Sequence, residues 1–190
     1  MSLRVLVIPE DPTHNGYILK PLVEAVLADL GKHSARVQVL TSPRLNGYDQ
    51  ARMAIRNELL TSYGHLDLWL FMPDADRATP AAMLAMETEM QGSGVALYCC
   101  PAQPEVEIYA CVAYRAEIAQ DWAATRANPR MKEEVFAPLL AAHGDPRRAG
   151  GGRDQMVSES LRNLPLLYSL CPELKRLRDR VDTHLQGRSR

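Results

Sequence analysis

The chain lacks the long apolar runs that would mark a membrane protein or a secreted one. No apolar stretch approaches the roughly 20 residues that a membrane helix needs. The apolar run at residues 3–8 is too short for a signal peptide, and acidic residues follow it at once. We therefore expect a cytoplasmic, soluble protein that has no membrane among its partners.

Cysteine and glycine patterns that carry common chemistry are also missing. The four cysteines are Cys99, Cys100, Cys111 and Cys171, and their spacing matches neither a CxxC pair nor a set of zinc ligands. We interpret them as small buried residues in a reducing compartment. The sequence contains no GxxxxGK[ST] loop, no GxGxxG motif and no GxSxG elbow, so it gives no sign of ATP hydrolysis or dinucleotide binding.

Charge of one sign is not in excess, and the bulk composition is that of a folded protein. The 190 residues are 46% hydrophobic, which is enough for one domain, or for one domain with a helical appendage. Charged residues make up 24%, so the chain does not have a disordered composition. The net charge of −1 provides no global basic field, although a local basic patch can still bind nucleic acid.

Short apolar segments alternate with amphipathic ones in the first hundred residues. The apolar segments, which predict strands, are residues 3–8, 36–40, 66–72 and 94–100. The amphipathic segments, which predict helices, are residues 17–30, 49–63 and 80–91. Strands that alternate with helices indicate a parallel sheet with right-handed crossovers, and therefore an α/β fold.

After Pro104 the pattern becomes helical. The helical segments are residues 105–121, 132–143, 158–170 and 172–185. We therefore predict an α/β domain over residues 1–122, followed by a helical C-terminal extension over residues 123–190 that packs on the same domain.

Two acidic clusters follow predicted strands. Glu10 and Asp11 come after the first strand, and Asp74 and Asp76 come after the third. Ligand sites in open parallel sheets form at the carboxyl ends of strands. Carboxylates that converge there repel one another, and a hard divalent cation such as Mg²⁺ relieves that repulsion. Acidic residues at these positions are also common in ordinary turns, so the spacing alone leaves both interpretations open.

The segments that carry these acids resemble the Toprim fold of topoisomerases, bacterial primases and overcoming-lysogenization-defect nucleases. The matching segments are VLVIPE at residues 5–10 and LWLFMPDADR at residues 68–77. The chain is also similar to small stand-alone Toprim-like proteins encoded beside ATPases in bacterial defence loci, through PEVEIYA at residues 104–110 and the helical stretch 154–181. The resemblance implies a Toprim-like parallel sheet flanked by helices, with a C-terminal helical extension.

The same resemblance implies roles for individual acids. Glu10 would be a general base or a carboxylate that shapes the metal site, and Asp74 and Asp76 would be catalytic ligands of Mg²⁺ or Mn²⁺. Two residues at i and i+2 of a helix point in different directions, so only one of Glu105 and Glu107 should face the site. The resemblance favours Glu107 as the further metal ligand, because the family's acidic residue is followed closely by an aromatic residue and Tyr109 fits that pattern. The chain departs from the family at position 11, where Asp11 stands in place of the usual glycine.

Five arginines are candidates for contact with nucleic acid. Arg44 and Arg77 follow predicted strands, and Arg147, Arg148 and Arg153 flank a run of three glycines. Guanidinium groups in loops suit contact with phosphates. Two alternatives stay open: Arg77 could pair with the neighbouring carboxylates, and the arginine- and glycine-rich segment could be an ordinary solvated loop.

These observations lead to two main hypotheses. The first is a metal-dependent Toprim nuclease that hydrolyses phosphodiester bonds in DNA or RNA. Its partners under this hypothesis are an ATPase in a defence system and further copies of the same chain in a homo-oligomer. The second is a catalytically degenerate Toprim-like module that binds nucleic acid or a partner protein. A receiver-like phosphotransfer domain is disfavoured, because it needs a lysine on a later strand and none occurs between Lys32 and Lys132.

Overall fold

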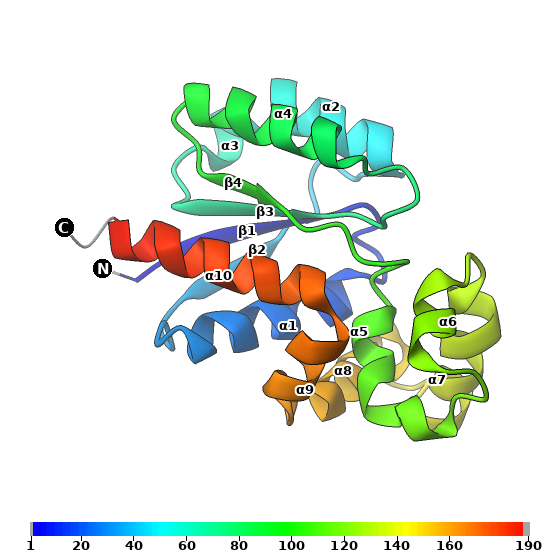
Figure 1. Ribbon diagram of the computed structural model, residues 1–190. Coiled ribbons are helices and arrows are strands. Elements are labelled where there is room, and N and C mark those ends of the chain that lie inside the picture. The colour runs from blue at the N-terminus through cyan, green and yellow to red at the C-terminus, as the bar shows by residue number, and fades with distance from the viewer. Residues whose placement is uncertain (1, 188–190) are drawn as a thin grey trace.

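A four-stranded parallel sheet lies between two layers of helices in the computed structural model, which describes residues 2–187 (Figure 1). The strands are β1 (Arg4–Pro9), β2 (Arg36–Val39), β3 (Leu68–Met72) and β4 (Leu97–Cys99). They are hydrogen-bonded in the order β2-β1-β3-β4, and every pair is parallel. The predicted α/β class, with a parallel sheet flanked by helices and a C-terminal helix, is therefore confirmed.

The two central strands are buried on both faces, as their continuous apolar sequences predict. All five residues of β3 are buried, and so are the residues of β1 after Arg4. The two strands pair from Val5 with Leu68 to Pro9 with Met72. β2 pairs with β1 on the side away from β3, so successive strands are added in opposite directions on the two sides of the β1–β3 pair. The carboxyl ends of β1 and β3 therefore form the topological switch point.

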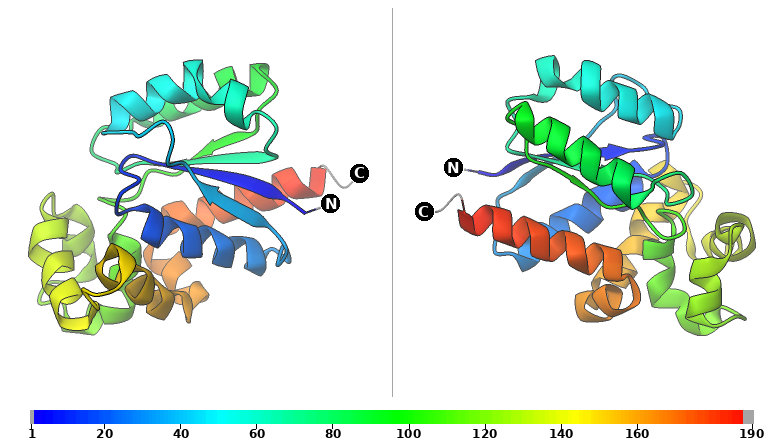
Figure 2. Two further views of the ribbon diagram at one scale, coloured as in Figure 1. Left: turned by 180° about the vertical axis from the view of Figure 1, so that it is seen from behind. Right: turned by 45° about the horizontal axis from the view of Figure 1, so that its top comes forward.

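Helices cover each face of the sheet and bury a separate apolar core there (Figures 1 and 2). One face carries α2 (Tyr48–Asn57), α3 (Leu59–Tyr63) and α4 (Pro80–Gly92). The other face carries α1 (Gly16–Asp29) and α10 (Pro172–Gly187). Alternation along β3 divides its side chains between the two cores, so that Trp69 and Phe71 meet α2 and α4 whereas Leu70 and Met72 face α1 and α10.

The remaining elements gather beyond the carboxyl ends of the strands, on the α1 side of the sheet (Figures 1 and 2). They are α5 (Ile108–Cys111), the 3₁₀ turn η1 (Val112–Glu117), α6 (Trp122–Ala127), the π-helical turn η2 (Lys132–Phe136), α7 (Ala137–His143), the 3₁₀ turn η3 (Ala149–Gly152), α8 (Arg153–Leu161) and α9 (Leu164–Leu170). Phe136 and Met156 from these elements join Val5 and Leu19 in one apolar core. The elements after residue 104 therefore form part of the wall around the strand ends.

Helix boundaries agree with the sequence where capping residues mark them. Thr79 caps α4 by accepting a hydrogen bond from the backbone N–H of Ala82 at 3.3 Å, as predicted. Gly31 follows α1 with a φ of 73°, which is the left-handed conformation that commonly ends a helix. No helix within residues 2–187 is long and apolar enough to cross a membrane.

Other helix boundaries differ from the prediction for local reasons. The expected helix 49–63 is divided at Glu58 into α2 and α3. α6 was not predicted; Asp121 caps it by accepting a hydrogen bond from the backbone N–H of Ala124. The expected helix 158–170 starts earlier and breaks where Asn163 caps α9, with Pro165 in the first turn of the new helix.

Candidate acidic cation site

Glu10 and Asp74 lie together at the switch point of the sheet. Each follows one of the two paired central strands, and the pairing of Pro9 with Met72 brings the strand ends level. Both carboxylates line one cavity of about 560 Å³. The other lining residues are Asp11, Thr13, His14, Asn15, Arg44, Leu45, Asn46, Gly47 and Lys132. The sheet topology therefore brings together two of the predicted acids.

The Asp74 carboxylate is held from the loop after β4. Its Oδ1 accepts a hydrogen bond from the backbone N–H of Val106 at 2.9 Å. The next backbone N–H, that of Ala75, donates to the carbonyls of Ala102 at 3.0 Å and Pro104 at 2.9 Å. The pKa of Asp74 is raised to about 7, chiefly by burial and also by the charges of nearby carboxylates, whereas the hydrogen bond from Val106 opposes the rise. A rigid frame thus holds this acid in an environment that disfavours its ionised form.

Glu10 occupies a similar environment. Burial raises the pKa of its carboxyl group, and the charge of Asp76 acts in the same direction. Backbone N–H groups of Asp74 and Tyr48 donate to Glu10 and oppose the rise. The carboxylate oxygen Oε2 of Glu10 is buried and accepts no hydrogen bond from any described residue. Glu10 therefore keeps one oxygen available at the edge of the cavity.

Glu105 and Glu107 extend the acidic cluster from the start of α5. Glu107 is fully buried, and Lys132 Nζ lies 3.0 Å from its Oε1. Burial and, to a smaller extent, the charge of Glu107 raise the pKa of Glu105 to about 7. The pKa of Asp74 responds to the charges of Glu107, Glu10 and Glu105, so the four carboxylates form one electrostatic group.

Lys132 contributes the positive charge of this group. Burial by itself lowers the pKa of Lys132, but the charges of Glu107, Asp74 and Glu105 outweigh burial and raise the pKa above its ordinary value. The ammonium is therefore held in its charged form. Sequence reasoning did not find Lys132, because the signal was only an isolated lysine at the start of a predicted helix.

Asn15 is a second residue that the sequence analysis missed. Its side chain lines the cavity, it is only 1% exposed, and its Oδ1 accepts no hydrogen bond from the described part of the chain. Asn15 is also the residue that precedes α1, yet its side chain makes no capping bond there. A buried amide oxygen without a partner is unusual, because burial without a hydrogen bond costs free energy.

Asp76 and Arg77 are not among the residues that line the cavity. Asp76 is exposed and does not line it, although its charge acts on Glu10 and Glu105. Arg77 is also exposed and pairs with Asp49 of α2 at 2.8 Å. Arg77 is thus paired with the helix on the other side of the loop.

The remaining candidate arginines have different surroundings. Arg44 is exposed and lines the acidic cavity. Arg148 pairs with Asp154 at 2.7 Å. Arg153 donates to the carbonyl of Gly150 at 2.9 Å and lies 5.5 Å from the ring centre of Phe136. Internal contacts therefore engage Arg148 and Arg153, whereas Arg147 is exposed on the same segment.

The oxygen atoms around the cavity are of the types that bind a hard divalent cation, but their positions match such a site only in part. Carboxylate and amide oxygens are the ligands that Mg²⁺ and Mn²⁺ prefer, and Oε2 of Glu10, Oε2 of Glu107 and Oδ1 of Asn15 have no hydrogen-bond partner within residues 2–187. Among those residues, however, no three His, Cys, Asp or Glu side chains are grouped closely enough to hold a metal ion. Glu10 and Asp74 with Asn15 are the residues that could hold one, with water and substrate as its further ligands.

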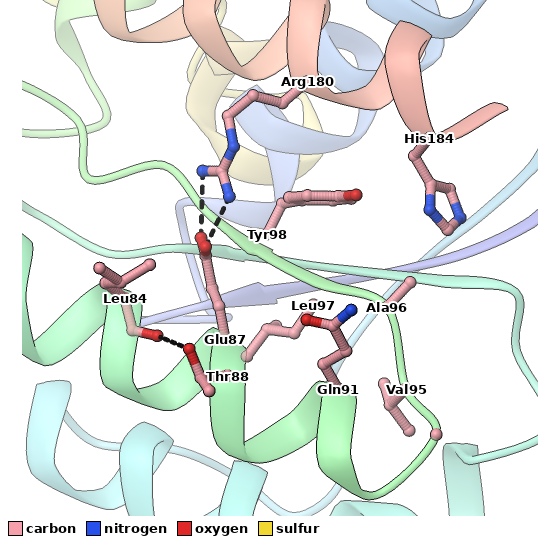
Figure 3. Close-up of a pocket in the computed structure, with 11 residues that line it drawn as sticks. Leu84, Glu87, Thr88, Gln91, Val95, Ala96, Leu97, Tyr98, Arg180 and His184 are labelled. Carbon is pink, nitrogen blue, oxygen red and sulfur yellow. Dashed lines mark hydrogen bonds and ion pairs between the residues drawn. The ribbon is translucent and has the colours of Figure 1, made fainter. Parts of the chain in front are cut away.

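A different cavity of about 350 Å³ lies between α4 and α10, along the open edge of β4 (Figure 3). Glu87 accepts a hydrogen bond from the backbone N–H of Cys99 at 2.7 Å and pairs with Arg180 at 2.5 Å. The guanidinium of Arg180 lies 4.7 Å from the ring centre of Tyr98. Glu87 and Arg180 thus pair with each other and cover the edge strand β4. We therefore interpret this pair as a structural contact that holds α10 against the sheet.

No family model, no curated protein and no solved structure matches the chain.

Proposed function

We propose that the chain is a nuclease that depends on a divalent cation and hydrolyses phosphodiester bonds in nucleic acid. One observation carries the proposal: Glu10 and Asp74, from adjacent parallel strands, line a single cavity at the switch point, and burial raises the pKa of both. Buried carboxylates whose ionisation is disfavoured are typical of functional sites. A cation between them would offset their mutual repulsion.

Four residues that line the cavity have a role under this proposal. Asp74, held by the N–H of Val106, and Asn15 would hold Mg²⁺ or Mn²⁺ together with Glu10. The ion would supply charge stabilisation at a phosphoryl oxygen. Glu10 retains one unpartnered oxygen and has a raised pKa, both of which suit a base that takes a proton from water. Arg44 lines the same cavity and is placed to contact a phosphate.

The resemblance to Toprim proteins supports the same proposal. Glu10 follows β1, and Asp74 and Asp76 follow β3, which is the layout on which the resemblance rests. We extend the proposal to a cytoplasmic role beside an ATPase partner, because the similar proteins of defence loci are encoded next to ATPases.

A second candidate function is a binding module without catalysis. Lys132 lies 3.0 Å from Glu107 and already compensates one of the acids. Asp11, in place of the family's glycine, adds a further side chain to the cavity. Both features favour a site that holds nucleic acid or a partner protein without cleaving it.

One experiment separates the two candidates. Plasmid DNA and single-stranded RNA are incubated with the protein in Mg²⁺, in Mn²⁺ and in chelator, and the test is repeated with Glu10→Gln and Asp74→Asn. Glu24→Gln, an exposed acid on α1, is the matched control. We expect cation-dependent cleavage that both site variants lose and the control retains. Cleavage that survives in both site variants would refute the assignment, and retention of nucleic acid without cleavage would favour the binding module.

A further inference from the structure

The acidic group contains four carboxylates and one lysine contact. The four carboxylates are those of Glu10, Asp74, Glu105 and Glu107. Within residues 2–187 they form one ion pair, in which Lys132 Nζ lies 3.0 Å from Glu107 Oε1. Glu107 is fully buried, and its Oε2 accepts no hydrogen bond from the described residues. A nearby cation stabilises the charged form of a carboxylate that is buried with so few partners, because burial of an unpaired charge is costly.

The chain places Lys132 at this position by an unusual local structure. Lys132 begins η2, a π-helical turn that leads into α7. Such turns are rare and occur frequently at functional sites. Lys132 also lines the cavity that Glu10, Asp74 and Asn15 share. The ammonium therefore stands between the buried Glu107 and the space where the divalent ion is proposed.

We propose that the Lys132 ammonium occupies a second cation position, beside Glu107, so that the site takes a single divalent ion at Glu10, Asp74 and Asn15. This inference rests on the proposed function for the identity of that ion. The buried, unpartnered Oδ1 of Asn15 supports it independently of the acids, because a neutral oxygen at the cavity wall is an additional ligand for an ion there. Lys132, which lies after residue 122, thus supplies the positive charge beside Glu107.

The inference predicts that removal of the ammonium creates a new ion site. The full-length chain is titrated with Mn²⁺, and bound ions per chain are counted by electron paramagnetic resonance over one range of free Mn²⁺. The variants are Lys132→Gln, the double variant Lys132→Gln/Glu107→Gln, and Lys20→Gln as an exposed control on α1. We expect Lys132→Gln to bind one more Mn²⁺ than the wild type. The double variant and the control should bind the wild-type number.

An equal count in Lys132→Gln and the wild type would overturn the inference, and so would an extra ion that persists in the double variant. If Lys132→Gln does not fold without metal, circular dichroism replaces the count. We then expect Mn²⁺ to restore its fold. A chain that stays unfolded in Mn²⁺ while the double variant folds would overturn the inference as well.

The outcomes for the inference and for the proposed function are distinguishable. A wild type that neither binds Mn²⁺ nor cleaves nucleic acid contradicts the proposed function. The gain in Lys132→Gln is counted relative to the wild type and therefore judges the role of Lys132. A wild type that loses two bound Mn²⁺ ions on Asp74→Asn would overturn the single-ion part of the inference.

Discussion

Val106 donates its backbone N–H to Oδ1 of Asp74 across 2.9 Å, and this bond joins the loop after β4 to the end of β3. Glu105 and Glu107 flank the donor in sequence, so the bond that fixes Asp74 also fixes two further acids beside it. The charges of both act on the pKa of Asp74. Together with the bonds from the Ala75 N–H to the carbonyls of Ala102 and Pro104, this contact brings carboxylates from two distant segments into one electrostatic group.

The free energy of unfolding of the metal-free protein should depend on pH because of these acids. The pKa of Asp74 rises from 3.8 to about 7 in the folded protein. Between these values the folded state binds more protons than the unfolded state, so the contribution of Asp74 to stability falls as pH rises from about 4 to about 7. A shift of this size corresponds at most to roughly 4 kcal/mol.

Thermal unfolding in chelator, from pH 4 to pH 8, checks this expectation. Asp74→Asn keeps an acceptor for Val106 and removes the charge, so its advantage over the wild type should grow across that range. Addition of Mn²⁺ at pH 7.5 should reduce the advantage. A constant difference between the two proteins at all pH values would show that burial does not disfavour the Asp74 charge.

Asn15 should matter for cation binding and little for folding. Its Oδ1 has no hydrogen-bond partner within residues 2–187, and its side chain does not cap α1. Asn15→Ala removes no protein hydrogen bond of that oxygen, so the free energy of unfolding in chelator should stay within about 1 kcal/mol of the wild type. The dissociation constant for Mn²⁺, measured by isothermal titration calorimetry, should rise. Unchanged Mn²⁺ affinity would exclude Asn15 as a ligand.

Gly152 should be intolerant of a side chain. Its φ is 85°, and an added Cβ would collide with the backbone N of Asp145 and lie 2.8 Å from Cα of Gly144. Gly31 is the matched control, since its φ is 73° and an added Cβ would meet nothing within 4 Å. Gly31→Ala should cost about 1 kcal/mol for the left-handed backbone alone, and Gly152→Ala distinctly more. Urea unfolding measures both, and equal costs would contradict the packed turn.

The candidate arginines should divide into binding and structural groups. Arg44→Ala should weaken binding of a labelled oligonucleotide, measured by fluorescence anisotropy, and reduce its salt dependence without lowering the unfolding temperature. Arg153→Ala should lower the unfolding temperature, because Arg153 bonds to Gly150 and packs on Phe136. Lys20→Ala, at an exposed position on α1, is the control for general charge loss. Equal effects of Arg44→Ala and Lys20→Ala on binding would remove Arg44 from the site.

Local patterns in the sequence predicted most of the fold. Buried parallel strands read as continuous apolar runs, and capping residues such as Thr79 mark helix ends, because these preferences depend on neighbours in the chain. The same patterns placed Glu10 and Asp74 at strand ends. α6 was not predicted although Asp121 caps it, and no side-chain cap marks the division of the helix at Glu58.

The sequence by itself determined the α/β class and the position of two acids after β1 and β3. Only the tertiary structure decided that those strands are neighbours, that Lys132 meets Glu107, and that Asn15 keeps a buried oxygen without a partner. It also turned Arg153 inward, onto Phe136. The physical reason is that strand order and side-chain pairing depend on which distant apolar surfaces pack together, and periodicity along the chain carries no record of that choice.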